Sequence, residues 1–247
     1  VEYMFTEEKD ISDFKYNNEV IDNVSSMDLF MYSGTSFEPW TNTFIDELKK
    51  GNLGIINLAR GVRLLNYYVE GASRENPYYF SGMEEYKIAL YNAKSAVQDR
   101  DPQNRDYYED NYNDAVKEFD EKLNKYSKKI SGLNDFTFVT LSSDFDYLLK
   151  GLGLNTLRLD NRELGEFIKI NNLDINKVVV VDDGEKPSDL DLSQYYSVKL
   201  WKYYGKMSFD DLIEYNVNEL CKFAKEGIVE ENTQDNVDSD KNKTENS

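Results

Sequence analysis

The strongest constraint on the fold is a run of apolar side chains between residues 108 and 130 that recurs every three or four residues. Their neighbours are mostly charged or amide residues, so the pattern predicts one amphipathic α-helix. Asp101-Pro102 provides a typical helix start and Gly132 a typical end. The apolar positions are Tyr108, Tyr112, Val116, Phe119, Leu123, Tyr126 and Ile130.

A helix of about 30 residues would be ~45 Å long, which exceeds one small lobe. We therefore predict a rigid helical link over residues 101–132. A coiled-coil dimer is the alternative, but the apolar positions are mostly aromatic, which suits packing along two lobes better.

Short apolar runs alternate with helical patterns on both sides of this segment. Such a rhythm predicts parallel sheets with helices on their faces, and the four valines at 178–181 indicate a strand buried on both faces. Strands are predicted at 28–32, 53–57, 136–140, 156–159, 177–181 and 198–201, and helices at 40–48, 83–99, 144–150, 163–171 and 208–225.

The sequence thus predicts an α/β protein of two lobes. Each lobe has a mostly parallel sheet flanked by helices, and one long rigid helix joins them with a cleft between the lobes. We place the N-terminal lobe at 1–100, the linking helix at 101–132, the C-terminal lobe at 133–229, and a disordered acidic tail at 230–247.

Composition limits the possible functions. With 40% hydrophobic residues, 19 Tyr and 13 Phe, the 247-residue chain can bury a substantial core. A formal net charge of −18 argues against nucleic-acid binding, which needs clustered Lys and Arg, and against adsorption to anionic membranes.

Histidine is absent from the sequence, and Cys221 is the single cysteine. Ser-His-Asp and Cys-His catalysis and His- or Cys-based zinc sites are therefore excluded, as is an intramolecular disulfide. The side chains of adjacent acids such as Glu84 and Glu85 point in different directions on a helix. We therefore interpret such pairs as solvated helix caps and not as a catalytic pair. We expect neither an enzyme nor a cofactor.

Nothing in the sequence approaches the ~20 apolar residues of a membrane span. No signal peptide or lipidation cysteine appears at Val1, so an exported protein would have had those parts removed.

One motif is more specific than these patterns. Gly34-Thr35-Ser36-Phe37-Glu38-Pro39-Trp40 closely resembles the Gly-x-x-Phe-Glu-x-Trp turn of the cluster A-I solute-binding proteins, which serve zinc and manganese ABC transporters and include the adhesin lipoproteins. Four further stretches resemble segments of the same family in the same order: 28–34, 101–111, 139–154 and 211–216.

The resemblance implies two α/β lobes joined by one rigid helix, with a ligand cleft between them. It also implies an extracellular protein, either a cell-surface lipoprotein or periplasmic, that works with an ABC permease in the membrane, and we expect a monomer. The family begins with a further strand and helix before the position of Val1, so we expect either a truncated sequence or a reduced first lobe.

The family typically binds its metal through three His, one sometimes replaced by Glu, and a further acid. The matching positions here hold Ser12, Tyr78, Ser142 and Lys202. Neutral hydroxyls are poor ligands for zinc or manganese. An ammonium ~4 Å from a divalent ion costs about 8 kcal/mol at an effective dielectric of 20. The resemblance therefore implies that the metal site is lost.

Three uses of the cleft remain open. In the first, Ser12, Tyr78, Ser142 and Lys202 bind a non-metal small molecule, with Lys202 facing an acidic neighbour or a ligand carboxylate. The aromatic wall of that pocket would be Tyr79, Phe80, Trp201, Tyr203 and Tyr204.

In the second, the cleft is filled, and the chain is an adhesion or interaction protein that binds through its tail or through residues 66–80. In the third, a metal site is rebuilt from Asp13, Ser143, Asp144 or Asp182. We favour the first, a solute-binding protein with a non-metal ligand.

Overall fold

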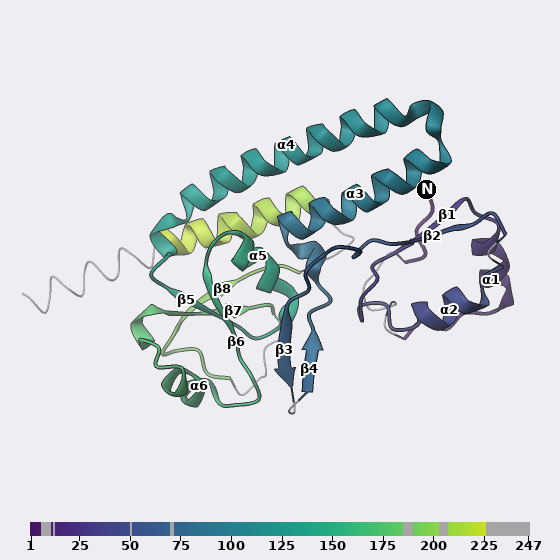
Figure 1. Cartoon of the computed structure of the whole chain (residues 1–247). Helices are drawn as coiled ribbons and strands as arrows, with labels where there is room; N and C mark the ends of the chain where they lie inside the picture. The colour runs from purple at the N-terminus through teal and green to yellow at the C-terminus, as the bar shows by residue number, and fades with distance from the viewer. Residues whose placement is uncertain are drawn as a thin grey trace, which may run out of the picture.

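The computed structural model describes residues 1–5, 11, 13–49, 51–69, 72–184, 190–202 and 207–225. It confirms the predicted α/β class, with a parallel sheet flanked by helices and a long helix (Figure 1). The predicted residues Ser12, Tyr203 and Tyr204 and the tail 230–247 lie outside the described residues.

The N-terminal group consists of α1 (Asn18–Ser25), β1 (Leu29–Tyr32), α2 (Thr41–Glu47) and β2 (Gly54–Asn57). β1 and β2 pair in parallel, as the strand-helix-strand pattern predicts. Asn17 caps α1 by accepting a hydrogen bond from the Val20 amide at 3.0 Å. Phe30, Trp40 and Phe44 pack edge to face between these elements, and Phe44 is fully buried.

An antiparallel hairpin that the sequence analysis did not predict follows, made of β3 (Asn66–Val69) and β4 (Ala72–Glu75). The residues Tyr67-Tyr68-Val69 favour a strand, but β4 is largely polar and lacks an apolar alternation. The hairpin lies next to the C-terminal sheet rather than extending β1–β2 (Figure 1). A 3₁₀ turn, η2 (Tyr79–Ser81), then leads into the long helices.

Two long helices pair antiparallel above the rest of the molecule (Figure 1): α3 (Met83–Arg100) and α4 (Arg105–Lys129). The 3₁₀ turn η3 (Pro102–Asn104) connects them, and the Asp101 carboxylate accepts from the Tyr108 hydroxyl at 2.7 Å. Lys94 of α3 forms an ion pair with Glu109 of α4 at 2.8 Å.

The predicted long helix is thus present, but its α-helical part begins at Arg105 and α3 runs alongside it. It is α3 that contacts both β1 and β2 of the N-terminal group and the later helix α5 (Asp146–Gly151). The division into lobes at residues 100, 101–132 and 133 stays a prediction.

The C-terminal sheet has four parallel strands in the order β6-β5-β7-β8. Helices α5, α6 (Leu164–Ile170) and an α-helix over 209–225 complete this part, and Ser208 caps the last one, as predicted. The strands are β5 (Thr137–Thr140), β6 (Asn155–Arg158), β7 (Val178–Asp182) and β8 (Tyr196–Lys199), with 3₁₀ turns η4 (Ser131–Leu133), η5 (Ser143–Phe145) and η6 (Ile175–Lys177).

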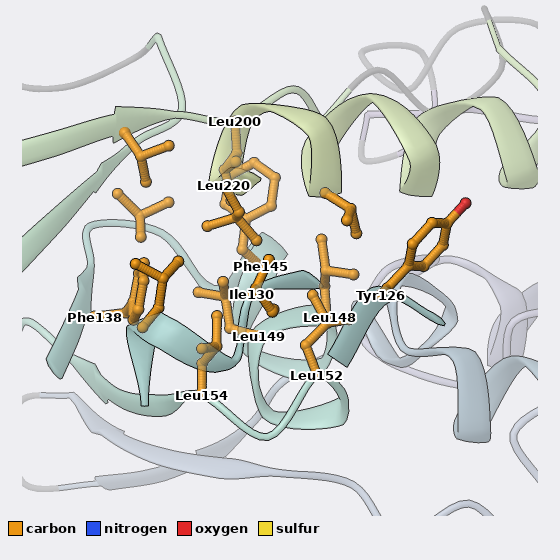
Figure 2. Packing of buried hydrophobic residues seen from close by; sticks show 14 of the residues in the cluster. Tyr126, Ile130, Phe138, Phe145, Leu148, Leu149, Leu152, Leu154, Leu200 and Leu220 are labelled. Atoms are coloured by element: carbon orange, nitrogen blue, oxygen red, sulfur yellow. The ribbon is translucent and has the colours of Figure 1, made fainter. Parts of the chain in front are cut away.

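The core covers both faces of this sheet. Val179 and Val181 face a large apolar cluster beneath α4, α5 and helix 209–225, whereas Val178 and Val180 face α6. The valine run is therefore buried on both faces, as predicted. Figure 2 shows the larger cluster, in which Ile130, Leu149 and Leu220 have no exposed surface.

We predict that Leu149→Ala lowers the free energy of unfolding by about 2–5 kcal/mol, because it leaves a cavity in this cluster. Ile170→Ala, on a side chain that is 57% exposed, should change it by less than about 0.5 kcal/mol. Urea unfolding followed by circular dichroism measures both. Equal losses in the two variants would contradict the core described above.

Candidate functional site

Parallel strands bring their carboxyl ends to one edge of the sheet, so the residues that follow β5, β7 and β8 meet there. Lys202, after β8, places its Nζ 3.6 Å from Oδ2 of Asp183, after β7. The Asp183 side chain is 5% exposed and that of Lys202 is 19% exposed. Asp144, after β5, is buried near both. We call Ser142, Asp144, Asp183 and Lys202 the acid–lysine cluster.

Burial raises the pKa of Asp144 above its ordinary value, because the charged carboxylate loses its hydration. The Asp183 charge raises this pKa further, whereas the neighbouring Ser142 hydroxyl and the Lys202 ammonium lower it. One ammonium thus faces two buried carboxylates and offsets their charge only in part, so the pKa of Asp144 stays raised.

The Tyr78 position lies on a loop over residues 76–79, here called the joint loop. Its Asn76 side chain is fully buried and donates to the Ser143 carbonyl at 2.7 Å and to Oδ2 of Asp146 at 3.1 Å. Oδ1 of Asp146 accepts from the Thr140 hydroxyl at 2.8 Å. These bonds attach the joint loop to the end of β5.

Tyr147 adds a second attachment. Its hydroxyl donates to the Asn76 carbonyl at 3.0 Å and accepts from the Leu65 amide at 2.8 Å. Burial raises the pKa of Tyr147 to about 12, so the phenol stays protonated and can donate at neutral pH.

The joint loop also binds the N-terminal group. The Thr35 hydroxyl donates to the Pro77 carbonyl at 3.3 Å, and the Tyr79 hydroxyl donates to the Ser33 carbonyl at 3.0 Å. Burial raises the pKa of Tyr79, which keeps this donor protonated as well. One short loop is therefore hydrogen-bonded to both parts of the molecule.

The turn at residues 34–40 has a clear physical basis. Gly34 has φ +78°, and a Cβ there would overlap the Asn57 side chain. Glu38 closes the turn by accepting from the Ser33 amide, and the Trp40 indole donates to the Ile11 carbonyl at 2.9 Å.

The phenol ring of Tyr78 packs against aromatic neighbours. Its centroid lies 5.6 Å from that of Phe37 and 6.1 Å from that of Phe80, and Phe37 and Phe80 are 5.0 Å apart. The contacts are edge to face, which is a favoured arrangement of aromatic rings.

The predicted site residues thus fall into separate places. Ser142 and Lys202 belong to the acid–lysine cluster, while Tyr78, Tyr79 and Phe80 lie on or next to the joint loop. Trp201 is 36% exposed and its ring lies 6.4 Å from that of Tyr215 on helix 209–225. The shared pocket with its aromatic wall stays a prediction.

The alternative metal ligands can also be placed. Oδ1 of Asp182 accepts from the Gly184 amide at 2.8 Å, and Ser143 is buried with its carbonyl bonded to Asn76. Within the described ranges, no three His, Cys, Asp or Glu side chains are grouped so that they could hold a metal ion.

A pocket of about 460 Å³ opens beside the joint, between the β3–β4 hairpin and the end of β6. Asn76 and Asp146 of the joint line it, together with Arg158. Sequence analysis missed all three, and also Tyr147. The one feature of the sequence that could have pointed to this pocket is Arg158, a lone cation inside the apolar strand predicted at 156–159.

We predict that Tyr147→Phe lowers the free energy of unfolding by about 1–3 kcal/mol, because it leaves the buried Asn76 carbonyl and the part-buried Leu65 amide without this partner. Tyr107→Phe, on a ring that is 66% exposed, is the matched control and should be neutral. Chemical denaturation compares the two. A neutral Tyr147→Phe would refute the joint described here.

We predict a pH-dependent gain in stability from Asp144→Asn. Because the folded pKa of Asp144 is raised, its contribution is fully present below the ordinary value of 3.8 and is lost as pH rises through the folded pKa. The amide avoids that loss. The variant's stability relative to wild type should therefore increase between pH 3.5 and 7, as thermal unfolding across that range will measure. For Asn42→Ala, an exposed position without a titrating side chain, the difference should stay flat.

Comparison with known proteins assigns the family. The family model described as zinc-uptake complex component A, periplasmic, matches residues 1–178. A metal ABC transporter substrate-binding lipoprotein of Lactococcus lactis is 25% identical over 166 residues, which cover 62% of this chain and 52% of that protein. The substrate-binding lipoprotein FimA of Streptococcus parasanguinis is 26% identical over 157 residues, covering 59% and 50%. The chain spans about half the length of these curated relatives.

Solved structures support the fold. A metal-free mutant of the periplasmic metal binding protein of Candidatus Liberibacter asiaticus aligns with a TM-score of 0.68 at 15% identity, covering 87% of both chains. FpvC of Pseudomonas aeruginosa in complex with Mn²⁺ aligns with a TM-score of 0.66 at 18% identity, covering 89% of this chain and 87% of that one. The matched family consists of substrate-binding proteins of ABC transporters, not enzymes. This chain belongs to the zinc-uptake component A family of metal-type substrate-binding proteins.

Proposed function

We propose that this chain is the extracellular solute-binding component of an ABC transporter and that its ligand is not a divalent metal. Membership of the family and the names of the relatives support the transport role and a permease as partner. They equally support a place outside the membrane, as a surface lipoprotein or periplasmic protein. In the described part of the chain, no helix is both long and apolar enough to cross a membrane.

The main support for a ligand other than a divalent metal is the Lys202 ammonium in the acid–lysine cluster. Lys202 follows β8, at the position that the family resemblance assigns to a metal-binding acid, and it lies 3.6 Å from the Asp183 carboxylate. A divalent ion bound here would have to displace or tolerate this positive charge. At ~4 Å the repulsion is about 8 kcal/mol for an effective dielectric of 20.

The other replaced positions support the same conclusion. Tyr78 is a neutral phenol that packs against Phe37 and Phe80, and Ser142 is a neutral hydroxyl beside Asp144. Zinc and manganese prefer imidazole or carboxylate, with thiolate also suiting zinc. Three of the four replacements lie among the described residues, and each lacks the chemistry of a metal ligand.

A second function, an adhesion or interaction protein on the same scaffold, is favoured by the joint loop. Its bonds to Ser33 and Thr35 on one side and to Ser143, Asp146 and Tyr147 on the other oppose relative motion of the two parts. A solute-binding protein of this class would release some of these bonds if it opened and closed around a ligand.

A thermal-shift screen of the whole chain tests the proposal. We expect no shift with Zn²⁺ or Mn²⁺, whereas a bound organic ligand at 100 times its Kd should stabilise the protein by about 2.7 kcal/mol. If the ligand lies in the cleft, Lys202→Ala or Tyr78→Ala should remove the shift. Lys199→Ala, an exposed lysine on β8, is the matched control and should leave the shift unchanged.

The two functions predict different results. A clear shift with either metal would overturn the non-metal proposal. The absence of any shift with metals, amino acids, small anions and cofactors would instead favour the adhesion or interaction function, in which the cleft is filled.

A further inference from the structure

The pocket between the β3–β4 hairpin and the end of β6, here called the hairpin pocket, has the size of a small-molecule site. Its volume of about 460 Å³ is within the usual range for ligand pockets. It is distinct from the acid–lysine cluster, because none of the four cluster residues lines it; its lining comes from β6, β3, the joint and α5. Four leucines supply its apolar surface: Leu65, Leu141, Leu157 and Leu159.

Arg158 is the unusual group of this pocket. Its Nη1 atom is buried and has no hydrogen-bond acceptor among the described residues. No carboxylate oxygen in that part of the chain lies close enough to pair with the guanidinium, whose Cζ is 5.8 Å from the centre of the Tyr67 ring. Burial lowers the pKa of Arg158, which reflects the cost of holding its charge away from water. Arg158 as a whole is half-buried, but a buried N–H without an acceptor is costly, and a ligand that engages the guanidinium would offset that cost.

The two acids of the pocket hydrogen-bond to other groups, and Asp146 acts on Arg158 only through its charge. Asp146 accepts from Thr140 through one oxygen and from Asn76 through the other. Asp160 forms an ion pair with the Arg162 guanidinium at 2.8 Å and also accepts a hydrogen bond from the backbone amide of Arg162.

A second cation reinforces Arg158. Lys150, at the end of α5, also lines the pocket; burial raises the pKa of Asp146, and the charges of Arg158 and Lys150 counteract part of that rise. Amides from Asn66 and Asn161 complete the polar lining. The hairpin pocket thus combines two cations with carboxylates that are already hydrogen-bonded, in a protein whose net charge is −18.

We propose that the hairpin pocket binds a small organic carboxylate with an apolar body, held by the Arg158 guanidinium. A carboxylate matches the two parallel N–H donors of an arginine, and the leucines suit a hydrocarbon portion. A singly charged group fits better than a phosphate, since a second negative charge would meet Asp146 and Asp160. This inference rests on the proposed solute-binding function and gives its ligand a chemical class.

Calorimetry on the full chain, with 4-methylpentanoate and benzoate as probes, tests the inference. We expect both to bind, and the neutral amide 4-methylpentanamide to bind at least tenfold more weakly. Arg158→Met should weaken carboxylate binding at least tenfold, and Lys150→Met several-fold. Arg105→Met removes a guanidinium on α4 with a 54% exposed side chain, outside the pocket lining, and should leave the affinity unchanged.

Any of four results would overturn the inference: no binding of either carboxylate up to about 10 mM, equal binding of the amide, phosphate binding better than both carboxylates, or unchanged carboxylate binding by folded Arg158→Met. If Arg158→Met does not fold, the exposed Lys150→Met provides the test instead. An unchanged carboxylate affinity of Lys150→Met would refute the site. Zn²⁺ titrated in parallel separates the two proposals. If zinc binds and the carboxylates do not, both proposals are wrong. If zinc and the carboxylates both bind, only the non-metal function is wrong. If neither zinc nor a carboxylate binds, the hairpin pocket is not a carboxylate site.

Discussion

The joint loop depends on the buried side chain of Asn76. Its amide donates to the Ser143 carbonyl and to Asp146, its own carbonyl accepts from Tyr147, and its Oδ1 accepts from the Tyr78 amide. Because unmade hydrogen bonds are expensive in a buried site, this set of bonds fixes the loop in one conformation. The positions of Tyr78 and Tyr79, and through them the contact with the N-terminal group, follow from it.

Several charged side chains lie at the sheet edge to which the joint loop is attached. Asp144, Asp146 and Asp183 are all held at the ends of parallel strands, where burial penalises their ionised forms. Lys202 offsets part of the Asp144 charge, and Arg158 together with Lys150 offsets part of the Asp146 charge. In a metal-binding relative a divalent ion would be such a compensating charge, and here lysine and arginine side chains provide it from within the chain.

The two cations differ in how far they are satisfied. Lys202 has a carboxylate at 3.6 Å, whereas Arg158 retains an N–H without an acceptor among the described residues. The β7–β8 side of the edge therefore resembles a closed ion pair, and the β6 side resembles an open site. That asymmetry is why the proposed carboxylate ligand is placed against the hairpin and not beside Lys202.

Sequence by itself determined the helix of residues 105–129, the valine strand, the parallel pairing of β1 with β2 and the turn at Gly34, because each depends on local periodicity or on one backbone conformation. Only the tertiary structure decided which strand ends became neighbours. The order β6-β5-β7-β8 brings Asp183 to Lys202 and leaves Arg158 at the edge beside the hairpin. Pairing between charges far apart in sequence depends on strand order and on the docking of a polar hairpin, and neither leaves a periodic signal in the chain.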